Sequence, residues 1–313
     1  MMLKNITKLP SLKESVILVV CLAIWLCVTG FCIGMRPEHG LLAFLIAGMF
    51  LFNGATRKFV VALVPFALFG ISYDWMNLLP NYEVNPIDVK ELYDAEKALF
   101  GITTAQGVLT PNEFFYLHNC SFMDFWAGVF YLCWVPVPIM FGIGLYFSRQ
   151  RKIYLHFAIV FLLVNLIGFA CYYIHPAAPP WYVIKYGFEP ILGTPGDVAG
   201  LGRFDAMTGW MVFDGLYSRN ANVFAAVPSL HSAYMVIAFY YSLRSRCAMW
   251  LRVVFAIIMI GIWFTAVYSC HHYIIDVILG ALCSVVGIAL FEIVLMKLPA
   301  FKRFIYNYTE YIS

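Results

Sequence analysis

The chain has 313 residues, of which 63% are hydrophobic and only 12% are charged, and its mean hydropathy is +0.82. An average soluble domain has roughly 25% charged residues, so this composition excludes an ordinary soluble protein and predicts an integral membrane protein. The net charge of +3 is too small to indicate binding to nucleic acid, and the basic residues stand in short clusters at the ends of apolar runs, where they orient membrane helices.

Eight stretches are apolar and long enough, or nearly so, to cross a bilayer, which takes about 20 residues. They are 16–35, 39–55, 58–79, 123–147, 153–174, 224–243, 248–269 and 273–296. The second is short, and the first has no small-residue cleavage pattern, so we expect the first to be retained as a helix. The sequence therefore predicts an all-α, polytopic membrane helix bundle with short interfacial helices.

The loops between these stretches predict the orientation, because Lys and Arg collect on the cytoplasmic side of a membrane. With the N-terminus inside, every inner segment is basic, and the segments carry Lys4, Lys8 and Lys13, Arg57 and Lys58, Arg149, Arg151 and Lys152, Arg244 and Arg246, and Lys297, Lys302 and Arg303. The long outer segments, about 80–122 and 175–223, have mixed charge. We therefore expect both termini in the cytoplasm.

The first long outer segment is expected to hold two short helices. "NPIDVKELYDAEKALFG" has an Asn cap, Pro at the first helical position and a terminal Gly, which predicts an amphipathic helix over about 86–100, lying on the membrane surface or in solvent. "TPNE", Thr110 to Glu113, is a capping box that starts a second helix. We divide the chain into N-terminal helices and outer loop (1–122), a catalytic membrane core (123–297) and a cytoplasmic tail (298–313).

Nine cysteines lie mostly inside apolar runs and have no metal-ligand spacing. We interpret them as small hydrophobic residues, with an external disulfide between Cys120 and Cys270 as the alternative. None of the acidic clusters is typical of a metal site, and we expect no metal or other cofactor.

Three histidines meet at one leaflet in the predicted topology. His175 follows the outer end of the fifth apolar stretch, His231 opens the sixth, and His272 opens the eighth. Side chains capable of acid, base or nucleophilic chemistry are thereby brought to one side of the membrane.

The pair His272 and Asp276, in "HHYIID", is spaced four residues apart, so the two side chains can meet on one helix face. A carboxylate bonded to one ring nitrogen raises the basicity of the other, which makes the imidazole a nucleophile or base. The alternative is an interfacial pair that only caps the helix. His271 points about 100° away around the helix and is interpreted as structural.

The stretch "VPSLHS" contains Pro228, which can begin a helix, and Ser229 in the first turn. Free N–H groups there could bind a phosphate, with His231 beside it as proton donor. The alternative is a capped helix with His231 at the membrane interface, and both accounts of Ser229, phosphate ligand and helix cap, stay open.

The stretch "HPAAPPWY", His175 to Tyr182, is extended and stiff because of its three prolines. His175, Trp181 and Tyr182 are candidates for contacting a lipid substrate. The two aromatic side chains also suit a plain anchor in the headgroup layer, which is the account we favour.

The succession of "PSLH" and "H-x-x-x-D" at the outer ends of two membrane helices resembles the second and third motifs of the type 2 phosphatidic acid phosphatase superfamily, the lipid phosphate phosphatases. The resemblance implies a six-helix phosphatase-like core. It also implies that His272 attacks phosphorus, that Asp276 orients His272, and that His231 protonates the leaving oxygen.

Two departures from the superfamily pattern narrow this resemblance. The first motif, Lys-x6-Arg-Pro, is absent, and Thr265 and Ala266 replace the expected Ser-Arg pair, so two phosphate-binding arginines are missing. "HPAAPPWY", "TPGDVAGLGRFD" and "PSLHSAY" look like the branch containing inositol phosphorylceramide synthases. The resemblance spans roughly 124–296 and leaves out the first three helices and the loop 80–122.

That branch matches Arg203 and Asp205 in "GLGRFD". Arg203 is the first candidate to supply the missing positive charge, since a guanidinium binds phosphate through two donors; the alternative is a loop salt bridge. Lys185 and Arg219 are weaker candidates. Asp205 is expected either to bond an inositol hydroxyl or to hold Arg203.

The resemblance implies transfer of phosphoinositol from phosphatidylinositol to ceramide or a related sphingolipid, through a phospho-histidine and with release of diacylglycerol. The alternatives are a lipid phosphate phosphatase that uses water and a lipid-binding or transport protein. The expected partners are these lipids and the bilayer, not nucleic acid. The active site is expected to face a bacterial periplasm or a Golgi lumen, and the oligomeric state is left open.

Overall fold

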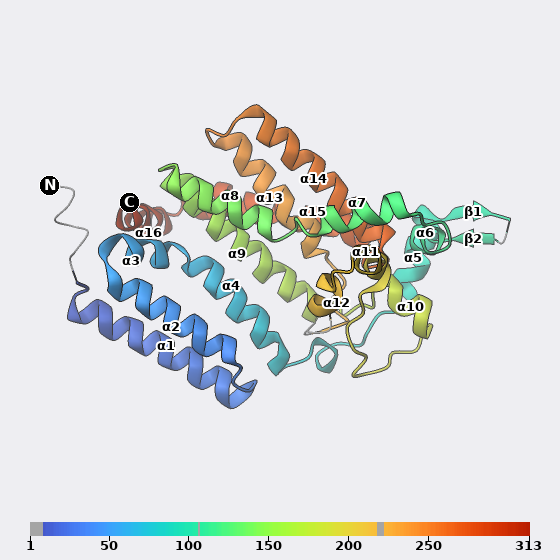
Figure 1. Ribbon diagram of the computed structural model, residues 1–313, viewed down its shortest axis with the longest axis horizontal. Helices are drawn as coiled ribbons and strands as arrows, with labels where there is room; N and C mark the ends of the chain where they lie inside the picture. Colours follow the sequence, from blue (N-terminus) through green and yellow to red (C-terminus); the bar gives the residue numbers. More distant parts are fainter. Residues whose placement is uncertain (1–8, 106, 218–221) are drawn as a thin grey trace. The chain divides into compact units, whose positions relative to one another are not determined.

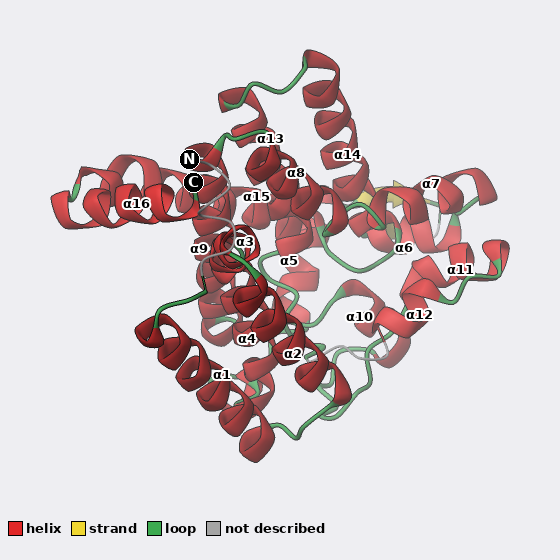
Figure 2. Ribbon diagram, turned by 60° about the vertical axis from the view of Figure 1, so that its left-hand side comes forward, coloured by secondary structure: helices red, strands yellow, loops and turns green. Residues whose placement is uncertain are grey.

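The computed structural model describes residues 9–105, 107–217 and 222–313 (Figure 1). Apart from one hairpin, the regular structure in these residues is helical (Figure 2), which confirms the all-α prediction. The chain divides into two compact units. One contains the residues up to Leu79 together with Leu298–Ser313, and the other is Pro80–Lys297.

The first unit contains α1 (Leu12–Cys32), α2 (Pro37–Phe52), α3 (Gly54–Ala62), α4 (Val64–Trp75), the 3-10 turn η2 (Met76–Leu78) and α16 (Pro299–Ile312). α3 and α4 meet at 47°, because Pro65 at the start of α4 has no N–H to continue the hydrogen-bond ladder. α16 packs on α3, and Tyr308 donates its hydroxyl to the carbonyl of Val61 at 2.6 Å.

The second unit is built on long apolar helices: α7 (Ser121–Tyr131) with α8 (Pro136–Phe147), α9 (Arg151–Ile174), α13 (Leu230–Arg244), α14 (Met249–Tyr268) and α15 (Ile274–Ala289). α15 continues through the π-helical η5 (Leu290–Val294) and the 3-10 turn η6 (Leu295–Lys297). α13 lies in the middle, packed on α9, α14 and α15.

Five helices in the described residues are long and apolar enough to span a membrane, and the bent pair α3 and α4 makes a sixth. This confirms a multi-pass membrane protein. Two of the eight expected spans are short: α2 has 16 residues and α13 has 15. The expected sixth span, 224–243, begins only at Leu230, since Ala177 pairs with the backbone on both sides of Ala225 and holds that segment extended.

Short elements between the long helices gather at one end of the second unit (Figure 1). We call the described parts of 80–120 and 175–229 the cap. The cap contains η3 (Asn81–Glu83), α5 (Lys90–Phe100), β1 (Ile102–Thr104), β2 (Gly107–Leu109), α6 (Pro111–Leu117), α10 (Pro180–Tyr186), η4 (Ala199–Leu201), α11 (Gly202–Thr208) and α12 (Val212–Tyr217). β1 and β2 are antiparallel, with Ile102 opposite Leu109. The loop 80–122, which the sequence assigns to the part with the N-terminal helices, packs instead with the core that carries the motifs.

The two helices expected in this loop are present, with one correction. α6 starts with the predicted capping box between Thr110 and Glu113. α5 begins at Lys90 instead of 86, because Asp88 accepts hydrogen bonds from the amides of the first turn and its own backbone pairs with the chain at Ala178. The apolar face of α5 packs inside the cap, and the opposite face, with Glu91 and Asp94, is exposed. The apolar face therefore contacts protein and not the membrane surface.

The prediction that Trp181 and Tyr182 of "HPAAPPWY" anchor the chain in the headgroup layer is wrong. Trp181 and Tyr182 are 5% and 0% exposed and belong to the hydrophobic cluster at the centre of the cap. Tyr182 also donates its hydroxyl to the carbonyl of Glu189 and accepts from the amide of Ile191. Both side chains therefore pack on protein inside the cap. Cys120 and Cys270 are both free thiols.

Candidate active site

The N-terminus of α13 brings His231 to the cap. Ser229 is the N-cap: its hydroxyl accepts from the amide of Ser232, and its own amide donates to the carbonyl of Asp276 at 2.9 Å. Gly280 allows α15 to approach this closely, since a Cβ there would lie 2.0 Å from the carbonyl oxygen of Ser229. Ser229 is fully buried, so of its two accounts the geometry is that of a helix cap.

His272 stands in a tight turn between α14 and α15. The amides of His271 and His272 both donate to the carbonyl of Ala266, and Cys270 has a φ of 62°, in the left-handed region that costs a non-glycine residue free energy. The turn therefore holds the His272 backbone against the end of α14, and the His272 side chain is 7% exposed.

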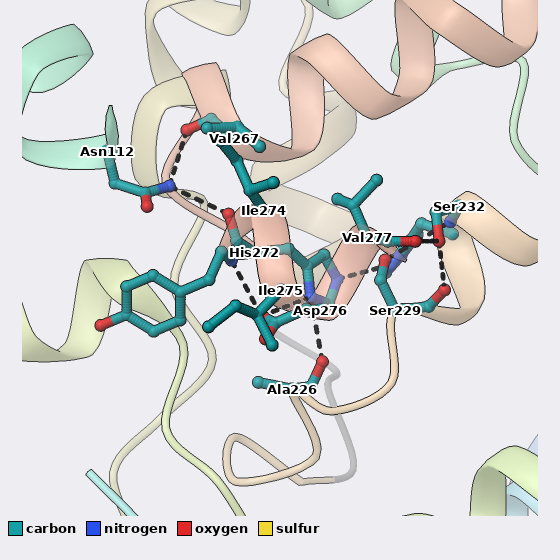
Figure 3. Close-up of polar contacts among 12 residues, drawn as sticks. Asn112, Ala226, Ser229, Ser232, Val267, His272, Ile274, Ile275, Asp276 and Val277 are labelled. Carbon is teal, nitrogen blue, oxygen red and sulfur yellow. Dashed lines mark hydrogen bonds and ion pairs between the residues drawn. The ribbon is translucent and has the colours of Figure 1, made fainter. Parts of the chain in front are cut away.

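The ring of His272 is oriented by two oxygen atoms (Figure 3). Its Nδ1 lies 3.1 Å from the carbonyl oxygen of Ala226 and 3.4 Å from Oδ2 of Asp276. A carbonyl can only accept, so Nδ1 carries the proton and Nε2 presents a lone pair. That Nε2 lies 3.0 Å from Nδ1 of His231, which places the two rings and the carboxylate in one chain of contacts.

Aromatic side chains fix the ring of His231. Tyr131 stacks on it with ring centroids 5.1 Å apart, and Trp134 meets it edge-on at 4.3 Å. His271 does not belong to the series of contacts that joins His231, His272 and Asp276, because its Nδ1 is bonded to the hydroxyl of Ser269. Burial and the neighbouring His272 lower the pKa of His271 to about 3, so His271 is neutral near pH 7, as a structural residue would be.

Arg203 and Asp205 each have a partner that the sequence did not indicate. Nε of Arg203 donates to Asp124 at 2.6 Å, and Tyr268 donates its hydroxyl to the same carboxylate oxygen at 2.8 Å. Burial by itself would lower the pKa of Arg203, but Asp124 and Tyr268 together outweigh burial and raise it. Asp205 does not hold Arg203. It accepts from the amides of Phe213 and Asp214 and caps α12, because its carboxylate faces the N-terminus of that helix.

The other candidates lie in the cap. Lys185 is paired with Asp197, and Nε2 of His175 lies 3.2 Å from Oδ2 of Asp88. Arg219 lies outside the described residues. The structure therefore brings His231, His272 and Asp276 into contact and engages Lys185 and His175 with acidic side chains elsewhere in the cap.

Sequence reasoning missed three side chains of this site. Asp124 had a usable signal: it is the one acidic residue in the apolar stretch 123–147, and a charge inside such a stretch predicts a partner. Tyr131 and Trp134 had none, since aromatic residues are common in membrane helices.

Comparison with known proteins places the chain in a family. The family model described as the PAP2 superfamily matches residues 97–290, which include both histidines and Asp276. The chain belongs to the PAP2 superfamily. Among curated members, the phosphoinositol dihydroceramide synthase of Bacteroides thetaiotaomicron is 58% identical over 305 residues, covering 97% of this chain and 100% of that protein.

Fungal members of the PAP2 superfamily also match. The catalytic subunit of inositol phosphorylceramide synthase from Saccharomyces cerevisiae is 28% identical over 245 residues, covering 74% of this chain and 56% of that protein. The Candida albicans inositol phosphorylceramide synthase is 33% identical over 164 residues, covering 49% of this chain and 33% of that protein. No solved structure matches. These relationships make the chain an enzyme, a phosphotransferase of the inositol phosphorylceramide synthase-like branch.

Proposed function

We propose that the protein transfers phosphoinositol from phosphatidylinositol to a ceramide-type lipid, with dihydroceramide as the first acceptor to test, and releases diacylglycerol. The observation that carries this proposal is the contact between His231 and His272, one ring oriented by Asp276 and the other by two aromatic side chains. The full-length similarity to a phosphoinositol dihydroceramide synthase supports the choice of substrates.

In the first step, the lone pair on Nε2 of His272 attacks the phosphorus of the donor lipid. The bond from phosphorus to the diacylglycerol oxygen breaks, and protonated His231 gives its Nδ1 proton to that oxygen. The negative charge of the phosphodiester favours the protonated form of His231. His272 becomes a phosphoinositol-imidazolium, whose positive charge Asp276 stabilises.

In the second step, His231 is neutral and takes the proton from the acceptor hydroxyl. The hydroxyl oxygen attacks phosphorus, the bond from phosphorus to Nε2 breaks, and His272 leaves with its lone pair restored. Each histidine thus returns to its starting state after one turnover, with one lipid headgroup moved.

Arg203 is proposed to bind a phosphate oxygen in place of the missing arginines. Its Nε is bound by Asp124, whereas Nη2 is buried and has no hydrogen-bond partner among the described residues. A buried guanidinium N–H without an acceptor is costly, and a phosphate oxygen would supply one.

We propose that the histidines face the outer side of the membrane. Gln150 and Arg246 are bonded side chain to backbone at 2.8 Å, so the basic loops that contain them lie together. They are at the opposite end of α13 from His231, since this helix runs from Leu230 to Arg244. Basic loops are cytoplasmic, and the opposite end is therefore external, in a periplasm or an organelle lumen.

The test uses purified protein with headgroup-labelled phosphatidylinositol, with and without dihydroceramide. We expect labelled inositol phosphorylceramide and repeated turnover only when dihydroceramide is present, whereas without it the release of diacylglycerol should stop at about one equivalent per enzyme. A rapid quench without acceptor should trap acid-labile label on the wild-type protein and none on His272→Ala. Release of inositol phosphate or phosphate regardless of acceptor would indicate a phosphatase and contradict the proposal, and so would a wild type without turnover.

A further inference from the structure

Two buried polar side chains of the cap contact the turn that carries His272, and the mechanism above uses neither. Glu96, on α5, and Asn112, on α6, are both 0% exposed. Both come from the loop 80–122, far from the motifs in sequence, and Asn112 reaches across 160 residues to the backbone of His272.

Glu96 is bonded to the N-terminus of α15. Its Oε1 accepts from the amide of Ile274 at 2.9 Å and its Oε2 from the amide of Ile275 at 3.1 Å. The preceding amide, of Tyr273, donates to Oδ2 of Asp276 at 2.8 Å. Two carboxylates thus satisfy three successive donors that a helix start leaves without partners, and one of these carboxylates is the group that orients His272.

Asn112 holds the other side of the same turn. Its Nδ2 donates to the carbonyls of Val267 and His272, both at 2.9 Å (Figure 3). One amide group therefore joins the last turn of α14 to the backbone of His272, across the strained Cys270. Without this donor, two buried carbonyls of the turn would lose a hydrogen bond.

The two contacts are mechanically linked. Tyr93, on α5, donates its hydroxyl to Oε1 of Glu113, on α6, at 2.8 Å, and the β1–β2 hairpin connects the two helices. We propose that α5 and α6 act together as a brace, in which Glu96 and Asn112 are positioning residues that keep Nε2 of His272 aligned for attack.

The chain retains this contact although it costs stability. Burial, together with the charge of Asp276, raises the pKa of Glu96 to about 7, and the two amides only partly offset this. A glutamine of the same shape would avoid the cost of the buried charge, but it has one acceptor oxygen and an NH2 group that would face an amide N–H. A carboxylate is the side chain that accepts from both amides at once.

The experiment compares full-length variants in detergent micelles, using the transfer assay of the proposed function. Both variants keep the side-chain shape: Glu96→Gln removes one of the two acceptor oxygens, and Asn112→Asp removes the donor to both carbonyls. We expect kcat to fall about tenfold or more with KM for both lipids within twofold, since the brace acts on the alignment of Nε2 and not on lipid binding. Glu96→Asp, which keeps the charge, should give an intermediate kcat.

Hydrogen–deuterium exchange supplies the second readout. Both variants should exchange faster in peptides from 267–280 and at wild-type rates in α9. Glu91→Gln and Asn119→Asp are matched controls, since these exposed residues of the same loop undergo the same chemical changes, and both should match the wild type. If Asn112→Asp does not fold, Asn112→Ala replaces it.

The outcomes separate this inference, which rests on the proposed function, from that function itself. A wild type that makes no inositol phosphorylceramide overturns the proposed function. An active wild type whose kcat is unchanged in Glu96→Gln and Asn112→Asp overturns the brace. The brace is also overturned if activity falls only in parallel with global unfolding, with no local change in 267–280.

Discussion

Nε2 of His272 and Nδ1 of His231 lie 3.0 Å apart, so the lone pair that would attack phosphorus accepts a hydrogen bond from the acid that would release the leaving group. A phosphoryl group cannot react with His272 unless it enters between the two rings. The packing of Tyr131 and Trp134 against His231 limits how far that ring can move aside, so we expect the rings to separate by a small shift upon substrate binding.

The acid role of His231 can be separated from a structural role by changing the leaving group. His231→Gln should lower kcat by about 10²–10⁴-fold with phosphatidylinositol, the range that general acid catalysis contributes. With an inositol phosphodiester of p-nitrophenol, which leaves without a proton, the loss should be much smaller. Equal losses for both donors would contradict the acid role. His118→Gln, on the exposed end of α6, is the matched control.

Asp276→Asn should lower kcat by less than a substitution that also changes the tautomer of His272. Nδ1 of His272 is also bonded to the carbonyl of Ala226, so the ring keeps its tautomer when the carboxylate becomes an amide. We expect kcat to fall about 10–100-fold, from lost stabilisation of the imidazolium, and not the ~10⁴-fold seen where the carboxylate alone sets the tautomer. Steady-state kinetics measure this, and a fall near 10⁴-fold would show that Ala226 does not hold the ring.

Arg203 and Asp124 should behave as one unit. Arg203→Lys should raise KM for the donor lipid about tenfold, because lysine lacks the planar fork that reaches both the carboxylate and a phosphate. Asp124→Asn should act in the same direction, and the double variant should be little worse than Arg203→Lys. Additive effects would indicate that Asp124 acts independently of Arg203. Arg36→Lys, in the first unit, serves as the control.

The buried carboxylate of Glu96 predicts how stability depends on pH. Its pKa is raised from 4.5 to about 7 in the fold, so between these values the folded protein binds more protons than the unfolded protein, and stability falls as pH rises. Glu96→Gln does not ionise. Its stability relative to the wild type should therefore increase by on the order of 2 kcal/mol between pH 5 and pH 8. Unfolding in micelles at several pH values measures this, and a constant difference would refute the shift.

The topology predicts where reporters function. Green fluorescent protein fused after Ser313 should fluoresce in a bacterial host, and alkaline phosphatase at the same position should be inactive, because the basic segments predict a cytoplasmic C-terminus. Alkaline phosphatase fused after a truncation at Asn119, in the cap, should be active. The reverse pattern would place the histidines in the cytoplasm.

Hydropathy determined the class of the protein, and motif spacing predicted the residues of its candidate active site. Long apolar runs form helices in a bilayer, because no water is available there to hydrogen-bond the backbone N–H and C=O groups. The helix bundle could therefore be predicted from local composition. "PSLH" and "HHYIID" indicated His231, His272 and Asp276, because residue type and short spacing are enough to suggest their chemistry. The starts of α5 and α13 could not be predicted. Both helices begin later than expected, because Asp88, Ala177 and Ala225 form backbone pairs between segments that are distant in sequence.

Only the tertiary structure decided which partners the polar side chains have. Asp124 holds Arg203, Asp205 caps α12, and Trp181 lies inside the cap, because folding brings these groups together across loops whose path no local pattern encodes. The roles of Glu96 and Asn112 could not be predicted for the same reason, since their hydrogen bonds to the turn of His272 cross 155 residues or more. A sequence names the groups that carry chemistry, whereas their alignment depends on hydrogen bonds between distant segments, which exist only once the chain has folded.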